Sequence, residues 1–236
     1  MYNLDYFKKY TADFNKTLAD NPLIYTDEIM YEDIPFFKEL KGSKVLVIGG
    51  GPTTNEREWD PSNYDFVLSC NHFFLNEKLS NTKVDFAHLS CECDFHREEF
   101  KNYVNKYNTI FCFENFAWDY EKNRVLSFKK DYPNRSIQLR LRYDSKLGVG
   151  ARLLVMATLF NPFSIDFVGI DGYKPGIKLG DDASHSFELG KTCSANYPYE
   201  LFHRQYYDLY QYLLSTKLKI NNLGYGHPNN ILSKFS

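Results

Sequence analysis

The sequence is poor in the features that mark membrane-spanning or secreted chains. No uninterrupted apolar run approaches the ~18 residues of a membrane-spanning helix. The N-terminal residues mix charges with aromatic side chains and lack the basic-then-apolar layout of a signal peptide. The cysteines number five, an odd count without framework spacing, which favours reduced thiols. We therefore expect a cytoplasmic protein without a membrane span, and peripheral attachment to the inner face of the membrane stays open.

An excess of one charge is also missing. The chain has 28 Lys and Arg against 30 Asp and Glu, a net charge of −2, which argues against a nucleic-acid partner. With 236 residues, 43% hydrophobic, it has the size and composition of a globular domain and not of a disordered chain, collagen or a coiled coil. Aromatic residues are abundant, at 17%. This abundance fits either A/T-rich codon usage or a surface that handles sugars or bases.

Short apolar runs alternate with helical patterns after residue 42, and this alternation predicts the fold class. The expected strands are Lys44–Ile48, Asp65–Cys70, Lys83–Leu89, Thr109–Phe113, Ile137–Leu141, Ser164–Ile170 and Leu218–Leu223. The expected helices between them are Arg97–Lys106, Gly150–Leu159 and Tyr199–Ser215. Such alternation is typical of a Rossmann-like α/β fold, in which helices cover both faces of a mostly parallel sheet.

Two segments stand apart from this pattern. Residues 1–42 are expected to form an N-terminal helical extension, with a helix near Asp5–Leu18, and residues 43–236 the main domain. Residues 171–197 are rich in Gly, Ser and Asp and carry no periodicity. Long segments of this kind are usually functional or mobile, so we expect a mobile loop there.

A glycine turn follows the first expected strand, over Gly49–Thr53. Glycines let the backbone approach a phosphate, and ligands of open α/β sheets bind at the carboxyl ends of strands. The third glycine of the dinucleotide fingerprint is missing, which weakens an NAD-binding interpretation. A tight turn without a ligand is the alternative. Asn71, at the end of the second expected strand, can contact a sugar or base, or cap the following helix.

Two other clusters have competing interpretations. Cys91 and Cys93, flanked by His88 and His96, fit a zinc site less well than buried cysteines, because C-x-C spacing is unusual for structural zinc. We expect no metal site. Arg140 and Arg142 share one face of an expected strand and fit either an anion site or a solvated edge.

Taken together, these residues resemble the bacterial sialyltransferases of glycosyltransferase family 42 and related nonulosonate transferases. The family's first strand runs into G-N-G-P-S, which Gly49–Thr53 resembles, and Cys70-Asn71 is similar to the C-N at the end of its second strand. Lys146–Gly150 resembles its helix start, and Gly169–Tyr173 its G-I-D-x-Tyr strand end. Residues 228–232, P-N-N-I-L, resemble its last turn. Gly50 and Val149 depart from the pattern, because the family places Asn and Ser there.

The resemblance implies a GT-A-like catalytic domain over residues 43–236 and an inverting transfer of a nonulosonic acid from a CMP-sugar to a glycan hydroxyl. It implies that His203, five residues before Asp208, is the catalytic base, with His185 as the second candidate, and that Tyr173 contacts the donor phosphate. The expected substrate-binding residues are Gly49, Gly50, Gly51, Pro52, Thr53, Asn71, Ser90, Lys146, Gly148, Val149, Gly150, Gly169 and Asp171.

The implied partners are a nucleotide-sugar donor and a glycan acceptor, and a homo-oligomer stays open. No cofactor is obligatory, since tyrosine hydroxyls, lysine and backbone N–H groups can hold a leaving monophosphate; Mg²⁺ is compatible but not required. Three alternatives stay open. The first is a pterin diphosphokinase-like enzyme with Asp171, Asp181 and Asp182 as metal ligands. The others are an NAD-binding Rossmann enzyme and a non-catalytic nucleotide- or sugar-binding module.

Overall fold

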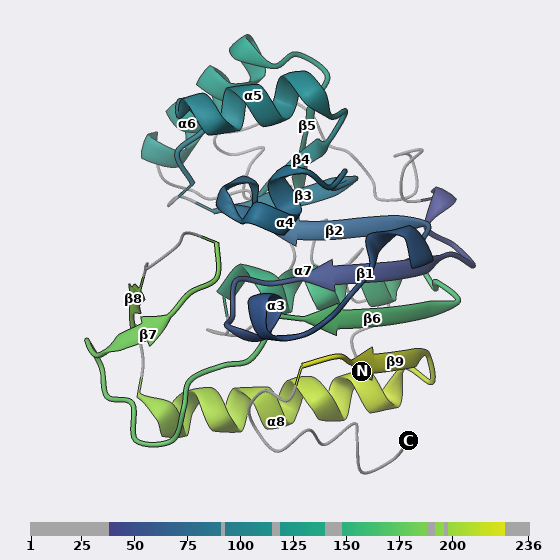
Figure 1. Cartoon of the computed structure of the whole chain (residues 1–236), viewed down its shortest axis with the longest axis vertical. Coiled ribbons are helices and arrows are strands. Elements are labelled where there is room, and N and C mark those ends of the chain that lie inside the picture. The colour runs from purple at the N-terminus through teal and green to yellow at the C-terminus, as the bar shows by residue number, and fades with distance from the viewer. Residues whose placement is uncertain are drawn as a thin grey trace, which may run out of the picture.

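A parallel sheet forms the centre of the protein (Figure 1). The computed structural model describes residues 38–90, 93–114, 119–139, 148–187, 192–195 and 198–224. Within them the sheet has seven strands in the order β5-β4-β3-β2-β1-β6-β9, each parallel to its neighbour. The strands are β1 (Lys44–Ile48), β2 (Phe66–Cys70), β3 (Phe86–Leu89), β4 (Ile110–Glu114), β5 (Ser136–Leu139), β6 (Ser164–Val168) and β9 (Lys219–Asn222). The expected Rossmann-like α/β fold is confirmed.

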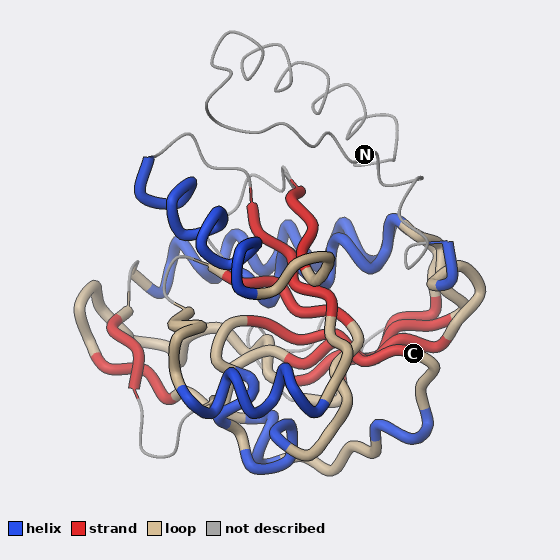
Figure 2. The backbone as a smooth tube through the Cα atoms, turned by 90° about the horizontal axis from the view of Figure 1, so that it is seen from above, coloured by secondary structure: helices blue, strands red, loops and turns tan. Residues whose placement is uncertain are grey.

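Helices lie on both faces of this sheet (Figure 2). The α-helices are α3 (Thr53–Glu56), α4 (Glu77–Ser80), α5 (Glu98–Lys106), α6 (Asp119–Asp131), α7 (Gly148–Leu159) and α8 (Tyr199–Ser215), and the 3₁₀ helices are η2 (Pro61–Asn63) and η3 (Phe73–Leu75). The sequence pattern did not predict α6. That helix is rich in Lys, Asp and Glu, so its apolar stripe is narrow and its period hard to recognise.

The inner strands of the sheet bury both of their faces, which gives two cores. Along β1, Val45 and Val47 join the core under α7 and α8, whereas Leu46 and Ile48 join the core on the opposite face. This alternation follows from the two-residue period of a strand. Because both faces are covered, the strands read as continuous apolar runs, as is usual for parallel sheets.

A cluster of aromatic rings fills the second core. Phe100 and Phe128 lie at its centre, and their rings are 6.1 Å apart. Around them pack Phe73, Phe74, Phe95, Tyr103, Phe111, Phe113 and Tyr132, mostly in edge-to-face or tilted arrangements. Aromatic rings bury large apolar areas in such arrangements. The aromatic residues of this cluster therefore stabilise the core and do not line a surface.

The strand order has a switch point between β1 and β6. The chain runs outward from β1 through β2, β3, β4 and β5, then returns to place β6 on the other side of β1. Loops that leave neighbouring strands in opposite directions open a crevice at the carboxyl ends, where ligands of such sheets bind. The switch point therefore directs attention to the loops that follow Ile48 and Val168.

Two expectations concern segments at the margins of the sheet. Most of the expected N-terminal extension, residues 1–37, lies outside the described residues. Within the segment 171–197, the structure has a short antiparallel ribbon, β7 (Asp182–Ser184) with β8 (Thr192–Ser194). Three-residue strands are too short to give a period, which explains why the sequence pattern suggested only a loop.

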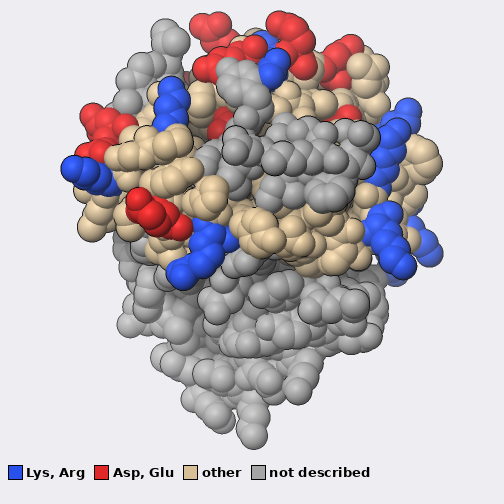
Figure 3. All heavy atoms as spheres, turned by 90° about the horizontal axis from the view of Figure 1, so that it is seen from below, with Lys and Arg blue, Asp and Glu red and all other residues tan. Residues whose placement is uncertain are grey.

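The described surface carries both charges. In Figure 3, acidic and basic side chains both appear on the face shown, and neither sign covers it. Among the described helices, none is long and apolar enough to cross a membrane.

Candidate functional site

The glycine turn and the loop after β6 meet at the switch point. The backbone N–H of Gly49 donates to the carbonyl of Val168, and that of Gly51 donates to the carbonyl of Gly169, both at 2.8 Å. A Cβ at Gly49 would collide with the carbonyl oxygen of Gly169. The two backbones are therefore in contact, and only glycine fits where they cross.

A buried carboxylate fastens these two loops. Asp171 accepts the backbone N–H of Thr53 at 2.9 Å and its hydroxyl at 2.5 Å, while the Thr53 hydroxyl accepts the N–H of Gly169 at 3.0 Å. Burial raises the pKa of Asp171, and the hydrogen bonds from Thr53 oppose that shift. Both oxygens of Asp171 are thus engaged with Thr53, so the geometry favours a positioning role for this expected substrate-binding residue.

A segment beyond β7 lies across the glycine turn. Ser186 donates its backbone N–H to the carbonyl of Gly50 at 2.8 Å and its hydroxyl to that of Gly51 at 2.6 Å. The side chain of Asn76, which also caps α4, donates to the carbonyl of Ser186 at 2.8 Å. We call residues 185–187 the strap. Sequence reasoning missed the parts that Ser186 and Asn76 play, because no local pattern links positions so far apart in the chain.

The strap places His185 directly against Gly50. A Cβ at Gly50 would lie 2.5 Å from Nε2 of His185. The backbone N–H of Phe187 donates to Nδ1 of the same ring at 3.3 Å. Of the two histidines predicted from the sequence, His185 is therefore the one in contact with the glycine turn.

The N-terminus of α7 borders the same turn. Its third residue, Gly150, is so close that an added Cβ would lie 3.6 Å from the Cα of Gly49. Gly148 begins the helix with a φ of +81°, and Val149 packs against the second core. The first N–H groups of a helix attract anions. Lys146, the remaining residue expected in this part of the site, lies outside the described residues.

Asn71 and Ser90 are brought together at the ends of β2 and β3. The side-chain oxygen of Asn71 accepts the backbone N–H of Ser90 at 2.8 Å. Asn71 has a φ of +48°, a left-handed conformation that Asn tolerates better than most residues. One amide atom of Asn71 thus holds two strand ends together, and its NH₂ group is the part that a ligand can use.

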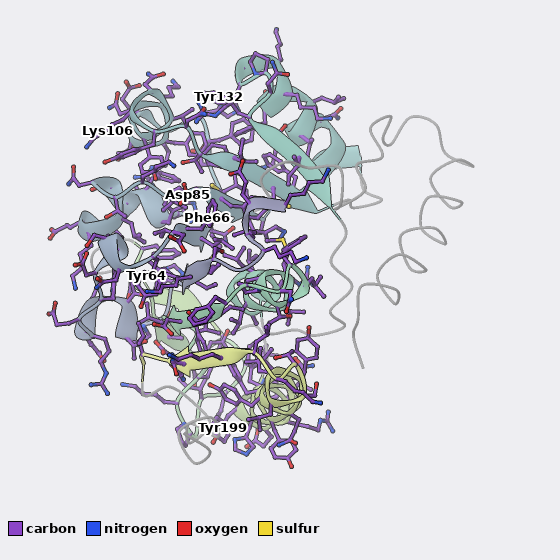
Figure 4. The ribbon with its side chains drawn as sticks, turned by 90° about the vertical axis from the view of Figure 1, so that its right-hand side faces the viewer. Tyr64, Phe66, Asp85, Lys106, Tyr132 and Tyr199 are labelled. Atoms are coloured by element: carbon purple, nitrogen blue, oxygen red, sulfur yellow. The ribbon has the colours of Figure 1, made fainter. Side chains whose placement is uncertain are left out.

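Tyr173 packs against the N-terminal part of α8, and His203 lies on that part of the helix. The ring of Tyr173 packs 4.4 Å from that of Phe202, and Nδ1 of the exposed His203 lies 3.2 Å from the hydroxyl of Tyr199. Figure 4 shows Tyr199 on α8, at the end of the molecule opposite Tyr132. The described site residues therefore lie in three places: around the glycine turn, at the ends of β2 and β3, and on and beside α8.

The structure describes only some of the residues that bear on a metal site. The described residues contain no group of three or more His, Cys, Asp or Glu side chains that could hold a metal ion. Cys91 of the zinc alternative and the strand arginines Arg140 and Arg142 lie outside the described residues. Cys93 is buried, and its thiol lies 3.6 Å from the carbonyl of Asn71.

One histidine of that alternative is buried inside the sheet. His88, on β3, is 5% exposed, and among the described residues its Nδ1 has no hydrogen-bond partner. Burial, and then the charge of Arg152, lower its pKa to about 3. His88 therefore stays neutral in the folded protein at pH values where the unfolded chain takes up a proton.

His88→Leu is expected to reduce the loss of stability in acid. Between pH 6.5 and 3 the unfolded chain binds a proton that folded His88 does not, so wild-type stability falls as the pH drops. Between pH 7.5 and 4.5 the variant should gain about 2 kcal/mol relative to the wild type. Urea unfolding at both pH values measures this, and an equal difference between the two proteins at both would contradict it.

Comparison with known proteins agrees with this architecture. No family model and no curated protein matches the sequence. Among solved structures, the chain is similar to the sialyltransferase CstII from Campylobacter jejuni, solved in complex with a substrate analogue, cytidine-5'-monophosphate. The TM-score is 0.53 at 18% sequence identity, and the match covers 83% of this chain and 84% of that chain. The protein thus has a sialyltransferase-like, GT-A-like α/β fold.

Proposed function

We propose that the protein is an inverting glycosyltransferase that transfers a nonulosonic acid from a CMP-sugar to a glycan hydroxyl. The observation that carries the proposal is the cradle at the switch point, where the glycine turn, the Gly169 loop and the N-terminus of α7 adjoin. Such a cradle suits a phosphate, because a helix N-terminus favours anions and the N–H of Gly50 donates to none of the described residues. The fold similarity to a sialyltransferase solved with cytidine-5'-monophosphate supports cytidine as the nucleoside.

In this proposal His203 is the general base. Nδ1 of His203 can donate to the hydroxyl of Tyr199, and Nε2 is then the nitrogen whose lone pair takes a proton. The acceptor hydroxyl attacks the anomeric carbon and gives its proton to Nε2. The bond from the anomeric carbon to the phosphate oxygen breaks, CMP leaves with the electron pair, and the configuration inverts.

The leaving CMP needs stabilisation of its developing negative charge. Tyr173 is proposed to donate its hydroxyl to the phosphate, and the cradle adds the helix N-terminus of α7. Neutral and partial-charge donors of this kind can stabilise a monophosphate, so the proposed mechanism uses no metal ion. The cytoplasmic location and the glycan acceptor belong to the same proposal.

The proposal predicts a selective thermal stabilisation by CMP. A ligand at about 100 times its dissociation constant stabilises a protein by ~2.7 kcal/mol. For a domain of this size, that raises the melting temperature by roughly 5–11 °C. The measurement is thermal melting with CMP, CDP, UDP, GDP, NAD and GTP, each with and without Mg²⁺.

The same panel distinguishes the alternatives. A shift with CMP that is independent of Mg²⁺ supports the proposal and leads to assays with CMP-sugar donors. A shift with NAD alone would replace it with the oxidoreductase alternative, and a shift that needs a triphosphate and Mg²⁺ would replace it with the diphosphokinase-like one. Binding of CMP without transfer would leave the non-catalytic module.

A further inference from the structure

Gly50 differs from the other glycines of the turn, because side-chain atoms alone stand where its Cβ would be, whereas backbone atoms of Gly169 also crowd Gly49 and Gly51. At Gly49 an added Cβ would collide with the backbone oxygen of Gly169, which cannot move without moving the sheet. At Gly50 the nearest atoms are Nε2 and Cε1 of His185, 2.5 and 2.7 Å from the Cβ position, followed by a ring atom of Phe187 at 3.2 Å. Gly50 therefore makes room for the His185 ring, since its three nearest neighbours are all side-chain atoms.

The strap fixes the place of this ring. Ser186 is bonded to the carbonyls of Gly50 and Gly51, and Asn76 holds the carbonyl of Ser186. Phe187 is almost fully buried, and its ring lies edge-on to His185 with centroids 5.3 Å apart. These contacts on both sides of His185 place its ring over the turn with little freedom to leave.

The hydrogen bond to Nδ1 determines which nitrogen carries the proton. The backbone N–H of Phe187 can only donate, so Nδ1 accepts it, and the neutral ring then carries its proton on Nε2. Nε2 is the atom next to Gly50. The ring thus presents an N–H donor at the turn, which suits an anion and does not suit proton abstraction by that atom.

A backbone donor lies at the same place. The N–H groups of Gly49 and Gly51 are bonded to the loop after β6, whereas that of Gly50 donates to none of the described residues. The turn therefore has two N–H donors on residues in contact with each other, the backbone N–H of Gly50 and the Nε2–H of His185. Two N–H donors beside a helix N-terminus form an anion-binding arrangement.

We propose that His185 is a substrate-recognition residue that donates Nε2–H to the phosphate of the nucleotide bound at the glycine turn. It thereby supplies, from a segment 135 residues further along the chain, a side-chain donor that Gly50 lacks. The proposal rests on the proposed function, since it takes the ligand to be a nucleoside monophosphate. It separates the two histidines, with His185 binding the donor and His203 taking the proton.

The test compares four proteins, the wild type, His185→Ala, Gly50→Ala and the double variant, with His96→Ala as control. His96 is an exposed histidine before α5. Isothermal titration measures the affinity for CMP and for cytidine, and melting without ligand confirms folding. His185→Ala should weaken CMP binding by roughly 10–100-fold, the loss of one hydrogen bond to a charged group, and leave cytidine binding within a factor of about 3.

Gly50→Ala should also weaken CMP binding, because its methyl group displaces the ring of His185. In the double variant the two losses should not add, since the ring that Gly50→Ala displaces is already gone. His96→Ala should bind CMP as the wild type does. Unchanged CMP binding by His185→Ala would overturn the proposal, and an equal loss for cytidine would overturn the assignment to the phosphate.

The experiment also distinguishes a failure of the proposed function from a failure of the proposal for His185. If the wild type binds no CMP, the proposed function is wrong, and the four proteins and the His96→Ala control are then titrated with inorganic phosphate. A phosphate affinity that falls in His185→Ala and not in His96→Ala would still support the anion contact. A phosphate affinity that is absent from the wild type, or that is the same in His185→Ala, would overturn it.

Discussion

Gly169→Ala is expected to lower the free energy of unfolding by at least about 4 kcal/mol, an exceptionally large loss for a single substitution. Gly169 has a φ of +69°, a left-handed conformation that costs an alanine roughly 1–2 kcal/mol. Its added Cβ would also collide with the hydroxyl of Thr54 and the backbone oxygen of Gly49. Relief of both collisions would separate β1 from β6 at the switch point. Circular dichroism with urea measures the loss.

Gly150→Ala is the matched control for that change. Its Cβ would meet nothing closer than Ile170 at 3.5 Å, an ordinary contact, and the residue lies within α7. Alanine is a better helix former than glycine by about 0.5–1 kcal/mol, so this variant should be as stable as the wild type or more stable. If both variants unfold at the same urea concentration as the wild type, the prediction that Gly169 is in tight contact with the glycine turn is contradicted.

His203→Ala is expected to reduce the transfer rate by roughly 10²–10⁴-fold, the usual contribution of general base catalysis. Affinity for CMP should stay within a factor of about 3, because the structure places His203 on α8 and not at the glycine turn. The measurement is kcat with a CMP-sugar donor, together with titration of CMP. A large loss of kcat with unchanged binding is the result that a base gives and a binding residue does not.

Gln211→Ala serves as the control on the same helix. Gln211 is exposed on α8, two turns beyond His203, and is expected to leave both rate and affinity unchanged. Full activity in His203→Ala would show that another group takes the proton. If His203→Ala weakens CMP binding and His185→Ala does not, the roles proposed for the two histidines are exchanged.

The strands of the sheet could be predicted from the sequence because their chemistry is local. Lys44–Ile48 and Phe66–Cys70 are short and apolar, and their ends are marked by Gly49 and Asn71. The expected strands at β3 and β6 were too long, since they included Lys83–Asp85 before β3 and Gly169-Ile170 after β6. Hydrogen bonding to a neighbouring strand decides where a strand ends, and a single segment does not contain that information.

The candidate site was predictable only in part. Gly49, Thr53, Gly169 and Asp171 were expected site residues, and the structure brings Gly49 against Gly169 and Thr53 against Asp171. The hydrogen bonds between Thr53 and Asp171 were not predicted, because the two residues are 118 positions apart and no local pattern links them. The resemblance favoured His203 over His185 as the base, but only the fold shows that His185 contacts the glycine turn and that His203 lies on α8.

Local patterns in the chain were enough to establish the class of fold. Alternating apolar runs and helical periods require a parallel sheet covered on both faces, and glycines at a strand end require a close approach of backbones. Which distant residues come into contact is decided only by the tertiary structure. The sequence alone does not show which side chain packs against Gly50. Gly50 becomes informative only when the strap brings His185 to within 2.5 Å of where a Cβ would stand, since contact between such distant segments arises only on folding.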